Sequence, residues 1–188
     1  MTKKSTAVFS VRTMAFCAMG AVLIMLCSWL SVPATVSFTM QTFAVFMLCD
    51  LLGGAAGLMS VLLYVLLGAL GLPVFAGFNS GIGTLLGPTG GYIMGFFLTA
   101  AVMLLQQKHL PDKALWRIAG MIAGLFVCYL FGTVWFLIVY AQRGTPITLM
   151  TALGWCVFPF IIPDLIKIAL AFLISGRVKR ALRAQRLL

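Results

Sequence analysis

Asp164 and Lys167 are the two residues whose types and spacing could best support chemistry. They lie three residues apart in an otherwise apolar stretch that reads Phe158-Pro-Phe-Ile-Ile-Pro-Asp164-Leu-Ile-Lys167. On a helix this spacing places both side chains on one face. The carboxylate and the ammonium could bracket a polar ligand, or they could form an internal ion pair that fastens this helix to a neighbour. Pro159 and Pro163 each remove a backbone donor, so we expect the helix to begin or kink just before the pair.

A glycine-rich, largely apolar segment from Gly71 to Gly91 contains further candidates. Asn79 can donate and accept hydrogen bonds, and Phe75 and Tyr92 could supply the apolar walls that small-molecule sites use. The segment suits a lid or a re-entrant loop over an outward-facing pocket. The alternative is an ordinary glycine loop in which Asn79 adopts a left-handed turn conformation. Gln41 could either lie at the pocket rim or cap the helix that follows it.

The composition indicates an integral membrane protein. Of the 188 residues, 63% are hydrophobic and 9% are charged, whereas about a quarter of a soluble domain is charged. An ionisable side chain inside a bilayer is costly and usually functional, which strengthens the case for Asp164 and Lys167. The net charge of +10 does not indicate nucleic-acid binding, because the basic residues form short, separated clusters. His109 is the only histidine, so we expect no catalytic residues and no metal site.

Six transmembrane helices in one domain over residues 1–188 are predicted from the apolar stretches and the basic clusters. The stretch 42–72 would be roughly 46 Å long as one helix, against a hydrocarbon core of about 30 Å. The positive-inside rule places the three basic clusters in the cytoplasm. An even number of crossings must then separate the first two clusters, so we expect this stretch to turn near Gly53 and Gly54. Asp50 would be a solvated carboxylate near the cytoplasmic boundary.

The expected fold is therefore all-α, with both termini in the cytoplasm. The glycine-rich segment would lie outside, as a lid between the third and fourth helices. The six predicted helices cover residues 11–30, 42–53, 56–72, 90–106, 115–140 and 150–175.

With these residues in view, the chain resembles the BioY family, the biotin-specific substrate-binding (S) components of energy-coupling factor (ECF) transporters. The most specific stretches are Gly68-Ala-Leu-Gly-Leu-Pro-Val-Phe-Ala-Gly77 and Leu86-Gly-Pro-Thr-Gly-Gly-Tyr-Ile-Met-Gly-Phe96. The chain departs from the family pattern at Ser37, where proline is usual, and at Pro163, where glycine is usual. It also has Gly-Ala-Ala-Gly after the second helix, where basic residues are usual.

The resemblance implies a protein of the prokaryotic cell membrane that captures external biotin with high affinity and needs no cofactor of its own. Import would require a transmembrane coupling subunit and two ATPase subunits, because this chain has no nucleotide-binding motif. Related S components dock through small residues of the first helix, which permit close helix approach. The nearest equivalents here are Ala15, Cys17, Ala18 and Ala21.

Biotin presents a ureido ring with two N–H donors and a carbonyl, an apolar thioether ring and an acidic tail. We expect Asp164 to accept a ureido N–H, and Asn79 and Lys167 to donate to ligand oxygens. Lys167 would also hold Asp164 ionised, and the end of biotin that it faces stays open. Two other functions fit the residues. One is a stand-alone ion-coupled carrier that uses Asp164 as its proton site, and the other is a membrane scaffold that transports nothing.

Overall fold

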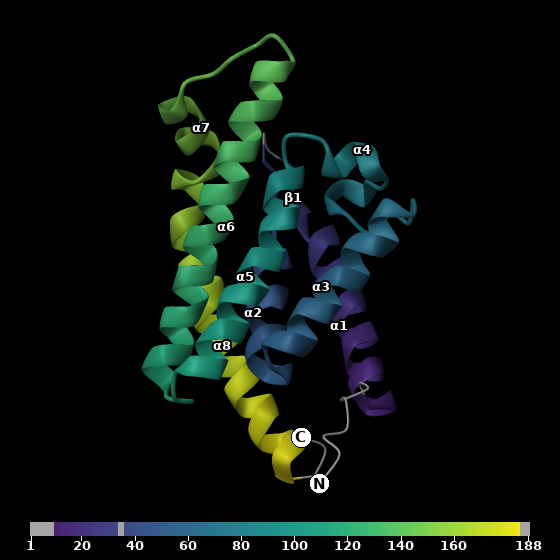
Figure 1. Cartoon of the computed structure of the whole chain (residues 1–188), viewed down its shortest axis with the longest axis vertical. Coiled ribbons are helices and arrows are strands. Elements are labelled where there is room, and N and C mark those ends of the chain that lie inside the picture. The colour runs from purple at the N-terminus through teal and green to yellow at the C-terminus, as the bar shows by residue number, and fades with distance from the viewer. Residues whose placement is uncertain (1–9, 34–35, 185–188) are drawn as a thin grey trace, which may run out of the picture.

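Helices make up most of the computed structural model, which describes residues 10–33 and 36–184 (Figure 1). The helices and strands, in chain order, are α1 (Val11–Trp29), β1 (Ser31–Val32), β2 (Phe38–Thr39), α2 (Gln41–Leu52), α3 (Gly54–Ala69), the 3-10 helix η1 (Ala76–Phe78), α4 (Ile82–Leu85), α5 (Gly90–His109), α6 (Ala114–Gln142), α7 (Leu149–Cys156) and α8 (Phe158–Ala184). The two strands pair antiparallel, with Ser31 opposite Thr39. The glycine-rich segment thus contains two short helices, η1 and α4.

In the part of the chain that the structure describes, four helical segments are long and apolar enough to cross a membrane. They are α1, α5, α6 and the segment Leu149–Leu182, which includes α7 and most of α8. The helices α2 and α3 are apolar but shorter, with 12 and 16 residues. At 1.5 Å per residue they extend over about 18 Å and about 24 Å, less than a hydrocarbon core of about 30 Å.

Gly53 forms the turn between α2 and α3. Its φ of 92° and ψ of 153° describe a conformation that residues with a side chain rarely adopt. Beyond the turn α3 packs closely back onto α2. A Cβ atom on Gly57 of α3 would lie only 2.5 Å from Sγ of Cys49 on α2. The amide of Gly54 donates a 2.7 Å bond to Oε1 of Gln107 on α5, which pairs one of the free N–H groups at the start of α3. The stretch 42–72 therefore turns where its glycines predict.

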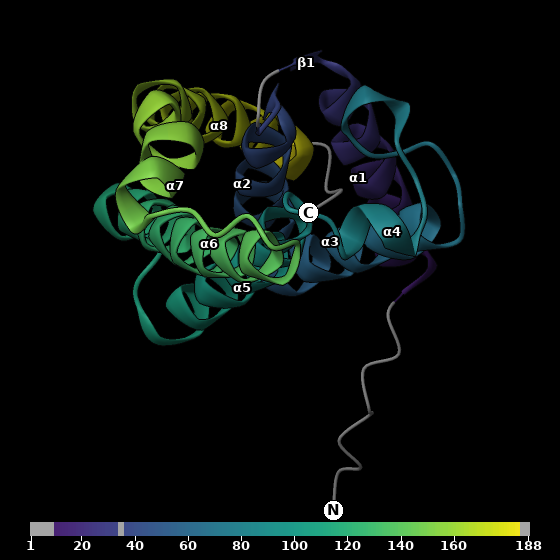
Figure 2. The ribbon, with the colours of Figure 1, turned by 90° about the horizontal axis from the view of Figure 1, so that it is seen from above.

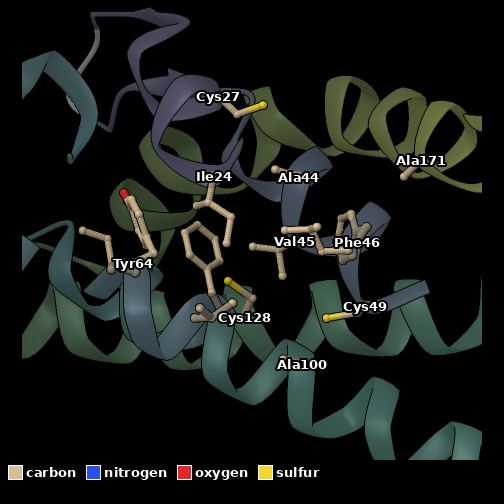
Figure 3. Close-up of a cluster of buried hydrophobic side chains, with 14 of the residues drawn as sticks. Ile24, Cys27, Ala44, Val45, Phe46, Cys49, Tyr64, Ala100, Cys128 and Ala171 are labelled. Atoms are coloured by element: carbon tan, nitrogen blue, oxygen red, sulfur yellow. The ribbon is translucent and has the colours of Figure 1, made fainter. Parts of the chain in front are cut away.

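Six helices form two layers that are seen end-on in Figure 2, with α1, α2 and α8 in one layer and α3, α5 and α6 in the other. The short helix α2 packs against α1, α3, α5 and α8. The hydrophobic core lies around it and includes Ile24, Val45 and Tyr64 (Figure 3). The free thiols of Cys27, Cys49 and Cys128 are also buried in this core. Burial on several sides fixes α2, and with it the residues at its start.

The last apolar stretch forms two helices, so the single helix predicted over 150–175 is wrong. Val157 separates α7 from α8 with φ −124° and ψ −59°. Pro159 lies in the first turn of α8. Backbone N–H groups in a first turn have no hydrogen-bond partner within the helix, so the absence of this group in proline breaks no helical bond. Pro163 lies inside α8, which continues to Ala184. The break lies next to Pro159, one of the two prolines at which a start or kink was expected, whereas Pro163 does not interrupt α8.

The start of α1 and the end of α8 lie at the same end of the molecule, at the bottom of Figure 1. The α2–α3 and α5–α6 turns lie at this end too. The β1–β2 hairpin, the α4 segment and the connection between α6 and α7 lie at the opposite end (Figure 1).

Two of the four predicted docking residues on α1 face inward. Cys17 and Ala21 are 1% and 2% exposed, and the Cys17 thiol donates to the carbonyl of Ala56 on α3. They cannot contact a partner subunit in this structure, so that part of the prediction is wrong. Ala15 and Ala18 are exposed. Sequence spacing marked small residues on α1 but did not indicate which of them α3 covers.

Candidate binding site

One pocket brings together all six residues predicted to bind a ligand. Its wall comes from the β1–β2 hairpin, the start of α2, the η1–α4 segment, α5, α6, the end of α7 and the first turns of α8. The predicted residues in this wall are Gln41, Phe75, Asn79, Tyr92, Asp164 and Lys167. Several of the segments that line the pocket, among them η1–α4 and the β1–β2 hairpin, lie at one end of the molecule (Figure 1).

Asp164 is a buried carboxylate with protein donors on both oxygens. Its Oδ1 accepts bonds from Nζ of Lys167 at 2.7 Å and from the Thr42 hydroxyl at 3.0 Å. Its Oδ2 accepts a bond from the Tyr129 hydroxyl at 2.5 Å. Because each carboxylate oxygen can accept about two hydrogen bonds, Oδ2 keeps one acceptor position. Asp164 can therefore accept one N–H from a ligand while it stays fixed by three neighbours.

Lys167 uses all three of its donors within the protein. Nζ donates to Asp164, to the Thr39 carbonyl at 2.6 Å and to the Thr42 hydroxyl at 3.2 Å, and it lies 4.0 Å from the centre of the Phe38 ring. Direct donation from Lys167 to a ligand oxygen, which the sequence led us to expect, would have to break one of these bonds. Lys167 instead orients Asp164 and fastens α8 to the start of α2. The charged pair thus fastens two helices and also presents a carboxylate to the pocket.

Gln41 lies in the pocket wall and does not cap α2. Its Oε1 accepts a 2.9 Å bond from the Thr39 hydroxyl, and its Nε2 donates to the hydroxyl of Tyr64. The backbone N–H of Gln41 donates to the Thr39 hydroxyl at 3.3 Å. Of the two positions left open by the sequence, the structure supports the pocket.

Phe75 is held by a close helix contact. A Cβ atom on Gly68 would lie 2.1 Å from Cζ of the Phe75 ring, so only glycine leaves room for the ring there. The Phe75 ring also meets Tyr64 edge-on, with 5.5 Å between ring centres. Across the pocket, the Tyr92 hydroxyl shares a 3.1 Å hydrogen bond with Thr133. Both aromatic rings therefore form a packed apolar wall.

Asn79 lies at the exposed rim of the pocket. Its Nδ2 donates a 2.8 Å bond to the Ala76 carbonyl, and its backbone is extended, with φ −71° and ψ 159°. The left-handed conformation suggested for Asn79 is instead adopted by Gly77 and Phe78, with φ of 68° and 60°. One amide hydrogen of Asn79 and its carbonyl oxygen remain for a ligand.

Two partners of Asp164 were missed at the sequence level. Tyr129 lies in the middle of the apolar helix α6, and Thr42 lies at the start of α2. The available signal was general, since a buried tyrosine hydroxyl usually finds a hydrogen-bond partner. That rule does not indicate which partner the hydroxyl finds.

Asp50 is buried, so the prediction of a solvated carboxylate is wrong. Its side chain is 2% exposed and forms an ion pair with Arg117 of α6, whose Nε donates a 2.8 Å bond. The Ser175 hydroxyl of α8 also donates to Asp50. Asp50, Arg117 and Ser175 thus form a polar cluster among α2, α6 and α8 that does not contribute to the pocket wall. Sequence position put Asp50 near a turn but did not reveal that Arg117 covers it.

Comparison with known proteins identifies close relatives. Residues 1–184 match the BioY family. The chain is 41% identical over 160 residues to the biotin transporter BioY of Thermotoga maritima, across 84% of this chain and 90% of that protein. It is 39% identical over 144 residues to a probable biotin transporter BioY of Pyrococcus horikoshii, across 77% of this chain and 81% of that protein.

The fold also has a solved counterpart. The structure resembles a 2.1 Å crystal structure of the S-component for biotin from an ECF-type ABC transporter. The TM-score is 0.76 with 26% sequence identity, and the similarity covers 96% of this chain and 95% of the other.

Proposed function

This chain belongs to the BioY family, and we propose that it captures extracellular biotin as the substrate-binding subunit of an ECF-type ABC importer. It is a multi-pass protein of the prokaryotic cytoplasmic membrane. Its relatives are transporters, so its task is recognition and delivery, and the chemistry of ATP hydrolysis belongs to partner subunits.

The observation that carries the proposal is the state of Asp164. Three protein donors fix this buried carboxylate, one acceptor position of Oδ2 remains without a protein donor, and Asp164 lines the pocket. A ureido N–H is a donor of the required kind, and the rings of Phe75 and Tyr92 suit the apolar bicyclic part of biotin. The free amide hydrogen of Asn79 can donate to a ligand oxygen. In this proposal Lys167 acts on biotin through Asp164.

For the membrane arrangement, we propose six crossings, with α2 and α3 as a short helical pair and α7 and α8 as one crossing. The end with the α2–α3 and α5–α6 turns faces the cytoplasm, because Lys108, Lys113 and Arg117 lie at the second of these turns. The pocket then opens to the outside, and the segment 70–89 covers it as a lid.

For the partners, we propose a transmembrane coupling subunit and two ATPase subunits. The exposed face of α1 that includes Ala15 and Ala18 would meet the coupling subunit, because small side chains let helices approach closely. No cofactor is needed by this chain itself, since binding of biotin involves no covalent step.

The test is calorimetric titration of the purified, detergent-solubilised protein with biotin, beside Asp164→Asn and the control Asp112→Asn. Asp112 is an exposed carboxylate in the α5–α6 connection, outside the pocket. We expect submicromolar binding by the parent and by the control, and at least about tenfold weaker binding by Asp164→Asn, because a hydrogen bond to a charged group contributes about 1.5–3 kcal/mol. No binding by a folded, monodisperse parent would overturn the proposal.

A further inference from the structure

We infer that the pocket recognises the ureido end of biotin and leaves the carboxylate tail without a cationic partner at the rim, so that esters and amides of biotin are also ligands. This inference rests on the proposed function and adds a substrate class to it.

The charge of the pocket lies in its buried floor and is internally balanced. Among the described pocket-lining residues, Lys167 is the one basic side chain and Asp164 the one acidic side chain. They are 4% and 2% exposed, and Nζ of Lys167 lies 2.7 Å from Oδ1 of Asp164. A ligand carboxylate brought to Lys167 would also approach Asp164, and two carboxylates that share one site repel each other.

The hydrogen bonds that Lys167 already makes also disfavour a ligand carboxylate beside it. Thr39, Thr42 and Asp164 accept its three N–H groups, and an ammonium has no fourth hydrogen. A ligand carboxylate could gain a bond from Lys167 only if one of these acceptors lost its own. The Thr39 carbonyl and Asp164 are both buried, so the loss would leave an unpaired polar group out of contact with water.

The rim differs from the floor in charge and in exposure. Its polar side chains are Ser37, Asn79, Thr84 and Thr89, which are neutral and half-buried or exposed. Hydroxyl and amide donors can bond to the oxygen of a carboxylate, an ester or an amide alike. A tail at the rim also keeps its contact with water, so its charge needs no partner. Neither feature selects the ionised acid over its neutral derivatives.

The floor and the rim of the pocket therefore bind opposite ends of the ligand. Oδ2 of Asp164, with its one open acceptor position, takes a ureido N–H at the floor. The apolar middle, lined by Phe75, Ile93 and Phe96, takes the thioether ring and the start of the chain. The acid then reaches the neutral rim. A substituent on the carboxyl group points out of the pocket and costs little affinity.

The experiment is calorimetric titration of the full-length protein in detergent with four compounds. They are biotin, biotin methyl ester, biotinamide and diaminobiotin, which lacks the ureido carbonyl bridge. We expect the ester and the amide to bind within about fivefold of biotin, and diaminobiotin to bind more than about a hundredfold more weakly. Loss of more than fivefold for both the ester and the amide, beside tight biotin binding, would overturn the inference alone. Absence of biotin binding would overturn the proposed function itself.

A gain-of-charge variant tests the rim directly. Thr84 lies in α4, half-buried at the rim, and Thr84→Lys would place a cation where the tail is assigned. We expect this variant to prefer biotin over its methyl ester by at least about threefold more than the parent does. Leu70→Lys, an exposed position outside the pocket wall, serves as the charge-matched control. An unchanged preference in Thr84→Lys would contradict the placement of the tail at the rim.

Discussion

The hydroxyl of Tyr129 on α6 donates a 2.5 Å hydrogen bond to Oδ2 of Asp164 on α8. Within residues 10–33 and 36–184 it is the one protein donor to the carboxylate oxygen that keeps an open acceptor position. Tyr129 thus determines in which direction Asp164 can accept a further bond. The orientation of the site consequently depends on α6 as well as on α8.

Removal of this hydroxyl should weaken biotin binding without loss of the fold. In Tyr129→Phe the ring stays but Oδ2 loses its fixed donor, and we expect about tenfold weaker binding, since a bond to a charged group contributes about 1.5–3 kcal/mol. Titration calorimetry measures the change. Tyr140→Phe, on the same helix but outside the pocket wall, should bind like the parent. Equal affinities for both variants would show that Tyr129 does not orient Asp164.

The buried pair of Asp164 and Lys167 should separate stability from binding. Lys167→Met leaves a buried carboxylate without its cation, and we expect the free energy of unfolding to fall by about 3–5 kcal/mol. The double variant Asp164→Leu with Lys167→Met removes both charges and should recover most of that loss, yet bind no biotin. Thermal unfolding in detergent and titration measure the two effects. Biotin binding by the double variant would exclude Asp164 from recognition.

The polar cluster at the other end of the molecule should matter for stability only. Asp50→Asn removes the negative charge that pairs with Arg117, and we expect the free energy of unfolding to fall by about 3 kcal/mol. The affinity for biotin, measured well below the unfolding temperature, should not change. Asp112→Asn removes an exposed carboxylate that lies 3.8 Å from Arg117, and it should lower stability by less than about 1 kcal/mol. Similar losses in both variants would contradict the assignment of Asp50 as the main partner.

Because Gly68 and Phe75 are in close contact, a single methyl group added at position 68 should weaken biotin binding. Gly68→Ala would place a carbon 2.1 Å from Cζ of the Phe75 ring, so the ring must move, and overpacking of this kind costs about 1–3 kcal/mol. We expect at least about fivefold weaker biotin binding. Gly154→Ala is the control, because no described atom beyond its chain neighbours and its own helix backbone lies within 4 Å of the added carbon. Full affinity in Gly68→Ala would show that the position of Phe75 does not matter to the ligand.

A bulky residue on the outer face of α1 should stop transport and leave binding intact. Ala18→Trp blocks close approach of a partner helix, so we expect biotin uptake by cells that express the whole transporter to fall at least about tenfold. Titration of the isolated subunit should give the parental affinity. Ala123→Trp places the same bulk on an exposed position of α6 and should not affect uptake. Normal uptake in Ala18→Trp would place the docking surface elsewhere.

Much of this fold could be predicted because its signals are local. Apolar runs mark the helices, and the turn at Gly53 follows from the length of the stretch 42–72 together with the basic clusters before and after it. The contacts of the site are not local, because Tyr129 and Thr42 lie 35 and 122 residues from Asp164. The same limit explains the error at Asp50, since no local pattern shows that Arg117, 67 residues away, reaches it. Isolated polar residues in apolar runs indicate where to look, and only packing determines their partners.

The helices α2 and α8 are joined at two separated points. Thr42 and Asp164 connect them beside the pocket, and Asp50 and Ser175 connect them toward the other end. Two bodies held at one point can pivot about it, whereas two bodies held at two points move together. We therefore expect α2 and α8 to move together as one rigid body. Entry and release of a ligand should then depend on displacement of the facing segment 70–89, with the geometry around Asp164 unchanged throughout the cycle.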